Sequence, residues 1–307
     1  MAAQRESCCP SLPRTMRAAR SRTSGAYLFV VLLMLHLTQE LEPPTNPERF
    51  ISGKAGLGEV VGVSYGHGSP TRCENARSMP DISPLARFEN CHSGERIVLV
   101  CNGPSLNEMD LSPLRYETVF GLNKIHLGLR RFGFYPRYLA AVNDKVIAQE
   151  APALRKMTAI KFITDRCRQL LPQDAFTFHI NTTRIPEPFC HDIARSVREG
   201  HTVTFVALQI ARYMGAAEVV IVGLDHRYTQ SGAPNAPLRM EGPDPNHFSP
   251  DYFGGKEWDA PNLAQSEASY RCAREAYERE GRRIIDVTRG GACTIFEKAR
   301  YEDIFGK

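Results

Sequence analysis

From residue 95 onward, short and continuous runs of apolar residues alternate with longer amphipathic segments. The run at 96–101 has no polar interruption beyond its first residue and ends in the turn sequence Asn-Gly-Pro-Ser at 102–105. Such a run is typical of a strand that is buried on both faces of a parallel sheet. The same pattern predicts strands over 96–101, 118–122, 138–142, 159–163, 176–180, 218–223 and 283–287.

Two of the segments between these runs carry apolar residues at helical spacing. In 202–215 the positions Val203, Val206 and Ile210 fall on one stripe, and 262–280 has a similar stripe before Gly281. Alternation of buried strands with helices predicts an α/β domain with an open, mostly parallel sheet of Rossmann type and helices on both faces. We expect this catalytic domain to occupy 95–307.

The preceding segment, 39–94, shows neither periodicity. It contains Pro43, Pro44 and Pro47 together with many glycines and serines. Such a composition is typical of a linker, so we expect a stem here.

The charge of the chain is concentrated at one end. The 307 residues carry 38 basic and 34 acidic side chains, a formal charge of +4. Residues 1–25 hold five arginines and one glutamate, so the other 282 residues are balanced at 33 of each sign. A domain without a basic block is a poor nucleic-acid binder.

The apolar segment 26–38 follows the arginine-rich tail. This order predicts a type II signal anchor with 1–25 in the cytosol and the domain in the lumen of the Golgi or another secretory membrane. A cleaved signal peptide, giving a secreted protein, and an organellar transit peptide are the alternatives. Asn181-Thr-Thr fits an N-glycosylation acceptor, usable in a lumenal domain.

Polar residues follow several of the predicted strands. Ligands of open α/β sheets bind beyond the carboxyl ends of the strands, and neutral amides and hydroxyls suit a sugar or nucleoside better than Mg²⁺. The alternative is that each residue serves only a turn or a helix cap. Neither GxGxxG nor GxxxxGK[ST] is present, which disfavours a dinucleotide cofactor or a P-loop. The candidates are Asn102, Ser105, Asn123, Asn143 and Asp225.

A second candidate lies in the proline- and glycine-rich loop 244–255. His247 stands there between Asp244 and Asp251. An imidazole beside carboxylates is suited to act as a general base near neutral pH. The alternative is a surface histidine in a polar loop.

Several of these motifs, in this order, resemble a known family. The resemblance is to the bacterial sialyltransferases of glycosyltransferase family 42, and to the related proteins with a flagellin-modification or hydroxymethylpterin-pyrophosphokinase-like domain. It covers roughly residues 96–306. The motifs that carry it are 100–106, 121–123, 202–211, 220–225 and 246–248.

The resemblance implies transfer of sialic acid, or a related nonulosonate, from a CMP-sugar donor to a glycan hydroxyl with inversion. Because the leaving nucleotide carries a single phosphate, we expect no obligatory metal or other cofactor. By position, Asn102, Gly103, Ser105 and Asp225 belong to the donor site, Asn123 and Asn143 bind the phosphate, ribose or sugar ring, and His247 takes the proton from the acceptor.

The chain departs from that family at two places. Cys101 stands where the family loop begins with glycine. Of the two tyrosines that usually receive the phosphate in the family, the first is replaced by Arg227, with Tyr228 one residue later, and the second has no clear counterpart in this chain. A guanidinium matches phosphate geometry, so we expect Arg227 to assist the leaving group. Two alternatives remain: a pterin pyrophosphokinase that uses ATP and a divalent cation held by Asp225, Asp244 and Asp251, and a non-catalytic nucleotide- or glycan-binding protein.

Overall fold

The computed structural model describes residues 83–184, 188–229 and 232–306, all within the compact unit Asn75–Lys307. The predicted tail 1–25, anchor 26–38 and most of the predicted stem lie outside these residues. Within the described ranges, no helix is both long enough and apolar enough to cross a membrane.

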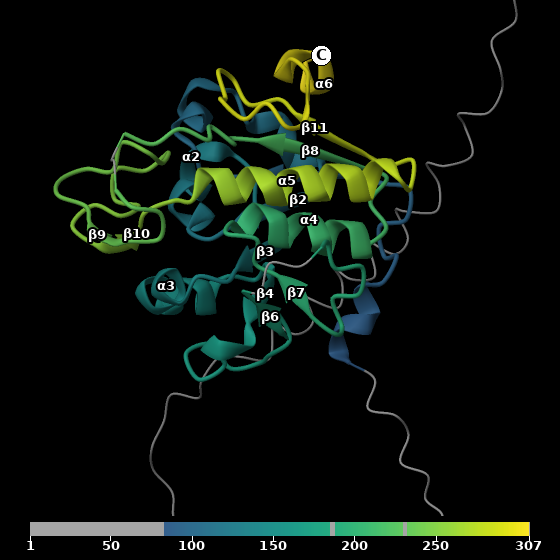
Figure 1. The fold of residues 1–307 in the computed structure, drawn as a ribbon, viewed down its shortest axis with the longest axis horizontal. Coiled ribbons are helices and arrows are strands. Elements are labelled where there is room, and N and C mark those ends of the chain that lie inside the picture. The colour runs from purple at the N-terminus through teal and green to yellow at the C-terminus, as the bar shows by residue number, and fades with distance from the viewer. Residues whose placement is uncertain (1–82, 185–187, 230–231, 307) are drawn as a thin grey trace, which may run out of the picture. The chain divides into compact units, whose positions relative to one another are not determined.

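The centre of the domain is an eight-stranded sheet in which every strand pairing is parallel (Figure 1). Each of the seven predicted runs forms one of its strands, with bounds that differ by at most two residues, and only the short β12 was not predicted. The order is β12-β11-β8-β1-β2-β3-β4-β5. The strands are β1 Arg96–Val100, β2 Val119–Leu122, β3 Tyr138–Ala141, β4 Ile160–Thr164, β5 Thr177–Ile180, β8 Glu218–Val222, β11 Arg283–Asp286 and β12 Glu297–Lys298.

The apolar runs are continuous because side chains of one strand feed two cores. In β1, Ile97 and Leu99 belong to the core on one face, whereas Val98 and Val100 belong to the core on the other. Alternate residues of a strand point to opposite faces, so a sheet covered on both sides needs apolar residues at every position.

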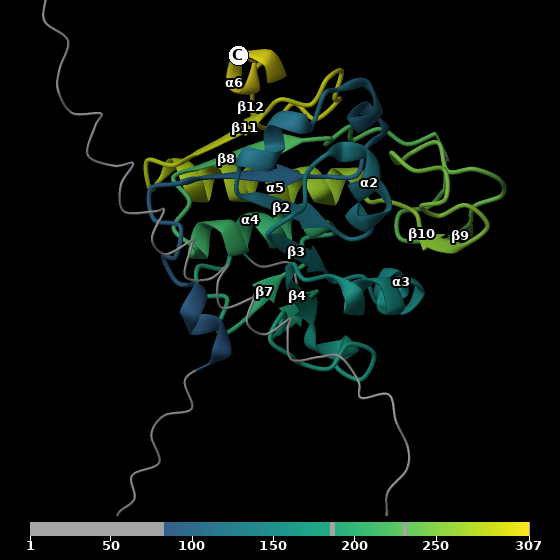
Figure 2. The same ribbon diagram turned by 180° about the vertical axis from the view of Figure 1, so that it is seen from behind.

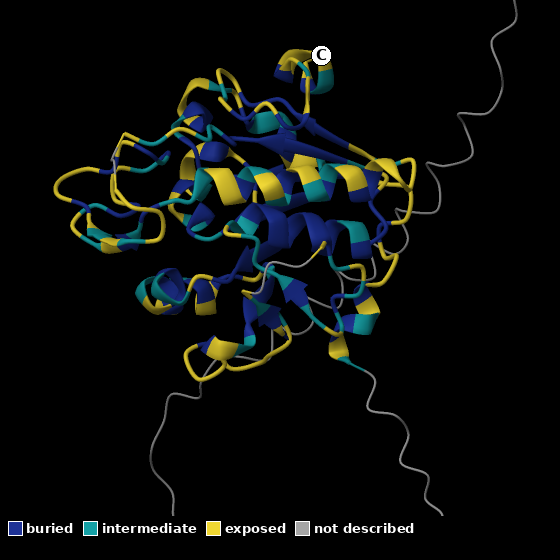
Figure 3. Ribbon diagram, in the orientation of Figure 1, coloured by how far each residue is buried: buried dark blue, intermediate teal, exposed yellow. Residues whose placement is uncertain are grey.

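Helices cover both faces, as predicted. Helices α4 (Val203–Tyr213) and α5 (Leu263–Glu278) lie side by side over one face, and α4 is buried along most of its length whereas α5 exposes its outer side (Figure 3). Helix α3 (Asp144–Lys156) packs into the core of the other face. The other helices within the described ranges are short: α2 Leu129–Phe132, α6 Tyr301–Phe305, and the 3₁₀ helices η2 Pro84–Phe88, η3 Pro104–Glu108, η4 Ser112–Tyr116, η5 Ile125–Gly128 and η6 Asp165–Cys167.

The folded domain includes residues from the predicted stem. Leu85 and Phe88 of η2 are buried in the core beneath α4, and the backbone N–H of Asn90 donates to the carbonyl of Tyr213 at 3.0 Å. The segment 83–94 of the predicted stem therefore packs onto the sheet domain.

The strand order changes direction beside β1. From β1 the chain adds β2, β3, β4 and β5 on one side, and then returns to place β8 and β11 on the other (Figure 2). In open α/β sheets this switch point leaves a crevice at the carboxyl ends of the two central strands. Two small pairs complete the fold: β6 Thr182–Thr183 with β7 Val197–Arg198, and β9 Pro237–Arg239 with β10 Glu257–Asp259.

Candidate functional site

The segments that follow β1 and β8 are joined at the switch point. The N–H of Gly103 donates to the carbonyl of Gly223 at 2.9 Å, and Ser105 donates to Asp225 through its N–H at 3.1 Å and its hydroxyl at 2.7 Å. Burial raises the pKa of Asp225 although Ser105 opposes the rise. A Cβ on Gly103 would lie 1.7 Å from the Asp225 carboxylate, so only glycine permits this close approach.

Two of the predicted asparagines present buried amide oxygens. The Oδ1 atoms of Asn102 and Asn123 have no hydrogen-bond partner among the described residues. Asn102 also accepts the N–H of Phe248 through its carbonyl at 3.0 Å, and Asn123 has a left-handed backbone with φ 46°. A buried polar atom without a partner is costly, so these amides are suited to a ligand that carries hydroxyl or amino groups.

Asn143 serves as a helix cap. Its Oδ1 accepts the N–H of Val146 at 3.1 Å at the start of α3. The alternative role as a helix cap therefore accounts for the side-chain oxygen of Asn143. The exposed side chain also lines the larger cavity described below.

His247 is held by a buried carboxylate. Its Nδ1 lies 2.8 Å from Oδ2 of Asp244, whose side chain is fully buried. Asp244 also accepts the N–H of Asn246 at 2.8 Å and that of Phe253 at 3.1 Å. Because a carboxylate accepts, this contact places the proton of a neutral imidazole on Nδ1 and leaves Nε2 as the acceptor.

The imidazole is also packed between aromatic rings. It stacks on Tyr252 at a centroid distance of 3.9 Å with the planes 1° apart, and the ring of Phe253 meets it at 5.3 Å and 78°. The His247 side chain is 11% exposed. The ring therefore has a defined orientation and a small accessible surface.

Arg227 and Tyr228 follow the β8 end of the site. Tyr228 stacks on Trp258 at 6.1 Å, and burial raises its pKa to about 12, so its hydroxyl stays protonated near neutral pH. Arg227 is exposed and donates to the carbonyl of Gly290 at 3.2 Å.

Two cavities meet at these residues. The larger has a volume of about 710 Å³ and the smaller about 130 Å³, and Asn123, Thr202, Tyr228, His247 and Tyr252 line both. The smaller lies at the switch point. The smaller cavity is also lined by Asn102, Gly103, Asp225 and Arg227. Asn143 lines the larger cavity. Ser105 lines neither cavity and is connected to the smaller one through its hydrogen bonds to Asp225.

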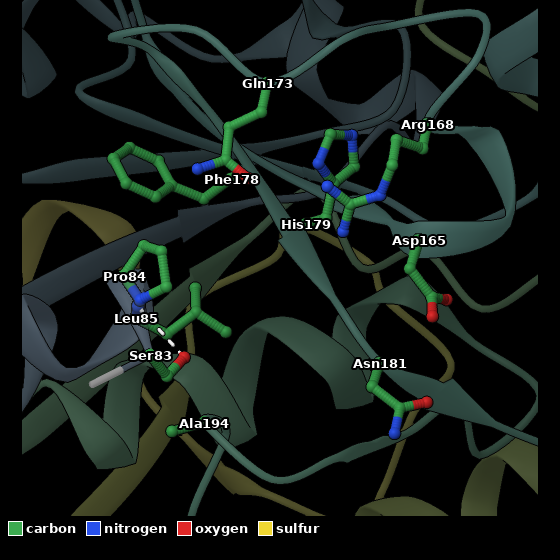
Figure 4. Close-up of a pocket in the computed structure, with 10 residues that line it drawn as sticks. All are labelled: Ser83, Pro84, Leu85, Asp165, Arg168, Gln173, Phe178, His179, Asn181 and Ala194. Atoms are coloured by element: carbon green, nitrogen blue, oxygen red, sulfur yellow. Dashed lines mark hydrogen bonds between the residues drawn. The ribbon is translucent and has the colours of Figure 1, made fainter. Parts of the chain in front are cut away.

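Asn181 does not belong to this site. It lines a separate pocket of about 200 Å³ together with Asp165 and His179 (Figure 4). Its exposed side chain donates to the carbonyl of Arg195 at 3.2 Å.

Carboxylates of the site are mostly engaged by protein groups. Asp225 accepts from Ser105 and Asp244 from His247, while Asp251 is exposed. In the described part of the chain, no three His, Cys, Asp or Glu residues form a group that could hold a metal ion.

Lys124 and Trp258 were not among the predicted site residues. Lys124 is completely buried and contacts the loop that carries His247, and the side chain of Trp258 lines the larger cavity. The only signal in the sequence for Lys124 is its position directly after Asn123. A single lysine after a strand is normally exposed, so this position does not predict a buried side chain.

Comparisons with known proteins place the chain in a family. One solved structure, of the MAf glycosyltransferase from Magnetospirillum magneticum AMB-1, is similar with a TM-score of 0.43 and 13% identity, over 71% of this chain and 37% of that chain. The chain thus spans little more than a third of that protein. Among curated proteins, no sequence matches the chain.

The sequence model of the family described as 6-hydroxymethylpterin diphosphokinase MptE-like matches residues 71–231, just over half of the chain. This match supports the pterin-pyrophosphokinase-like part of the resemblance and leaves the sialyltransferase part as an expectation. The chain belongs to the 6-hydroxymethylpterin diphosphokinase MptE-like family.

Proposed function

We propose that the protein is a glycosyltransferase that moves sialic acid, or a related nonulosonate, from a CMP-sugar to a glycan hydroxyl with inversion. The observation that carries this proposal is the pair of His247 and Asp244, with Nδ1 and Oδ2 2.8 Å apart, at the junction of two cavities. An imidazole in that tautomer accepts a proton through Nε2, as deprotonation of an acceptor hydroxyl requires.

Two adjoining cavities suit two substrates. The smaller cavity, with the unpaired amide of Asn102, is assigned to the nucleotide donor. The larger cavity is assigned to the acceptor. Its charged residues pair with one another, Lys145 with Asp259 at 2.6 Å and Arg184 with Asp144 at 3.0 Å, which favours an uncharged, hydroxyl-rich ligand such as a glycan.

The departing phosphate is assigned to Arg227 and Tyr228. The guanidinium supplies positive charge and the protonated phenol supplies a hydrogen bond where negative charge develops. A nucleoside monophosphate leaves with one phosphate, so this chemistry requires no resident metal or other cofactor.

A second candidate is the pyrophosphoryl transfer that the description of the family names. This reaction needs ATP and a divalent cation held by carboxylates. Asp225 and Asp244 would have to exchange their present partners, Ser105 and His247, for the cation. The geometry therefore favours the sugar transfer.

The chain is proposed to act in a secretory membrane, anchored through 26–38 with its domain in the lumen. A protease-protection assay on microsomes that contain the full chain, with an endoglycosidase treatment, tests this. Protection together with loss of mass on deglycosylation supports a lumenal domain with a glycan at Asn181, and digestion of the domain in intact microsomes contradicts it. A protected but carbonate-extractable domain indicates a secreted product, and import into organelles indicates a transit peptide.

The proposed reaction is tested on the purified full chain. Thermal shifts are measured with CMP, CDP, UDP, ATP and GTP, each with and without Mg²⁺, and release of CMP is measured with CMP-sialic acid and mixed glycans. We expect stabilisation by cytidine nucleotides without Mg²⁺ and turnover that EDTA leaves unchanged. Stabilisation by ATP with Mg²⁺ alone would favour the kinase, and CMP binding without turnover would indicate a non-catalytic binding protein.

The role of His247 is tested by His247→Ala, with His191→Ala as the control. His191 is exposed, 3.6 Å from Glu280, and lines neither cavity. We expect His247→Ala to lower turnover at least about 100-fold, the lower end of general-base contributions, and His191→Ala to have no effect. Equal turnover in the two variants would remove His247 from the mechanism.

A further inference from the structure

A buried lysine connects three parts of the domain behind the site. Lys124 follows Asn123 at the end of β2, and its side chain is 0% exposed. Its Nζ donates to the carbonyl of Tyr252 at 2.6 Å and to Oε1 of Gln149 at 2.7 Å, and lies 3.2 Å from Oε1 of Glu150. The ammonium group thus joins the end of β2, helix α3 and the loop that carries His247.

The charge of this lysine is balanced inside the protein. Glu150 lies within 3.1 Å of both Lys256 and His126. Burial lowers the pKa of Lys124 to about 8. Burial also opposes ionisation of Glu150, yet hydrogen bonds from His126 and Lys256 and the charge of Lys124 hold the pKa of Glu150 at about 2. A buried ion pair adds little net stability because the cost of desolvation offsets the attraction between the charges. Stability alone therefore does not account for the buried pair of Lys124 and Glu150.

The contacts of His247 depend on the segment that Lys124 holds. The imidazole stacks on Tyr252, whose carbonyl accepts from Lys124. The Lys124 Nζ also lies 4.5 Å from the ring centroid of Phe253. Phe253 makes a T-shaped contact with the imidazole and donates its N–H to Asp244. Two of the residues that orient the ring, Tyr252 and Phe253, therefore contact the ammonium group directly, and Asp244 is connected to it through Phe253.

We propose that Lys124 is a positioning residue for His247, which fixes the orientation of the imidazole by holding the backbone of Tyr252 against α3. Its importance for turnover rests on the proposed function. The orientation of the ring is a property of the protein alone, so the two are measured separately.

The chain contains a matched control. Lys161 on β4 is also 0% exposed, and among the described residues its Nζ donates to two backbone carbonyls alone, those of Met157 at 2.8 Å and Ala159 at 3.2 Å. It lines neither cavity of the site. Lys161→Met therefore removes a buried ammonium group without touching the loop of His247.

The first readout is the ¹H–¹³C NMR signal of the His247 Cε1–H group, assigned by its loss in His247→Ala. Stacking on Tyr252 places this proton in the ring current of the phenol. We expect Lys124→Met to abolish most of that ring-current shift in the free protein and Lys161→Met to leave it unchanged. Lys124→Gln, which keeps a donor group, serves if Lys124→Met fails to fold, and we expect the same direction. An unchanged shift in the folded Lys124 variant, or an equal loss in Lys161→Met, overturns the proposal.

The second readout is turnover. We expect the Lys124 variant to lower kcat about 10- to 100-fold, as a small misplacement of a catalytic group does, with the donor KM unchanged. If the protein transfers no sugar, the proposed function fails while the NMR comparison still decides the role of Lys124. A parallel rise in donor KM, or normal kcat with a lost ring-current shift, contradicts the positioning role in catalysis.

Discussion

Replacement of Asp244 by asparagine separates the role of its charge from its shape. Oδ2 of Asp244 accepts from Nδ1 of His247 at 2.8 Å and from the N–H of Phe253 at 3.1 Å, and Oδ1 accepts from Asn246. An amide keeps the oxygen that faces Asn246. Its NH₂ group then points at the N–H of Phe253, so two donors oppose each other in a fully buried position.

The magnitude follows from these contacts. A hydrogen bond to a charged group contributes about 1.5–3 kcal/mol, and a buried donor left without a partner costs about 1–3 kcal/mol. We therefore expect Asp244→Asn to destabilise the domain by about 3 kcal/mol. Its effect on turnover is larger, because the amide donates to Nδ1 of His247 and moves the ring proton to Nε2, where it blocks base catalysis. The corresponding change in a Ser-His-Asp triad costs about 10⁴-fold.

Three measurements on the full chain test this reasoning: urea unfolding, calorimetric binding of CMP, and release of CMP from CMP-sialic acid. We expect a lower unfolding midpoint, near-normal CMP affinity, and turnover lowered by about 10²–10⁴-fold. Asp251→Asn is the control, since it makes the same chemical change in the same loop at an exposed position. Turnover within about 10-fold of the native protein in folded Asp244→Asn would refute the assignment of the pair as a general base.

Three further outcomes follow from the site and its supports. Gly103→Ala places a methyl group 1.7 Å from the Asp225 carboxylate, so we expect loss of the thermal shift with CMP, and an undiminished shift would contradict the donor assignment of the smaller cavity. Asn143→Ala removes the cap of α3 and should lower the free energy of unfolding in urea by about 1 kcal/mol, whereas Asn143→Asp, which keeps a capping oxygen, should leave it unchanged. Glu150 has a pKa of about 2 in the folded protein against 4.5 as the ordinary value, so it binds fewer protons when folded, and its stabilisation is full above about pH 5 and lost as the pH falls toward 2. Glu150→Gln should therefore show a smaller loss of stability between pH 6 and pH 3 in urea titrations, and parallel curves would refute the lowered pKa.

Seven strands of the large sheet and the helices α4 and α5 were predictable because their determinants are local, whereas helix α3 was not predicted. A strand buried on both faces needs an unbroken apolar run, as 96–100 shows, and α4 needs one stripe at helical spacing. Strand β12 was missed because it has two exposed charged residues. The sequence predicts a stem that includes 83–94, because two isolated apolar residues, Leu85 and Phe88, show no periodicity that would indicate their burial.

The site was predictable only in part. Five polar residues could be placed at strand ends, but an Asn or Asp there has several possible uses, and only the fold distinguishes them: Asn143 caps α3, whereas Asn102 and Asn123 present unpaired amide oxygens. The resemblance of the 246–248 motif pointed to His247. Its partner Asp244 stood three residues away, yet which acid of the loop contacts the ring depends on how the loop closes.

By itself, the sequence determined a parallel α/β sheet, its strand segments and a set of polar groups at strand ends, because hydrophobic periodicity and turn residues act within a few positions along the chain. The tertiary structure alone decided the strand order, and with it the switch point that brings Ser105 to Asp225, 120 residues away. It also decided the burial of Lys124 beneath Tyr252, 128 residues apart. Such contacts depend on the packing of whole elements, which no local pattern encodes.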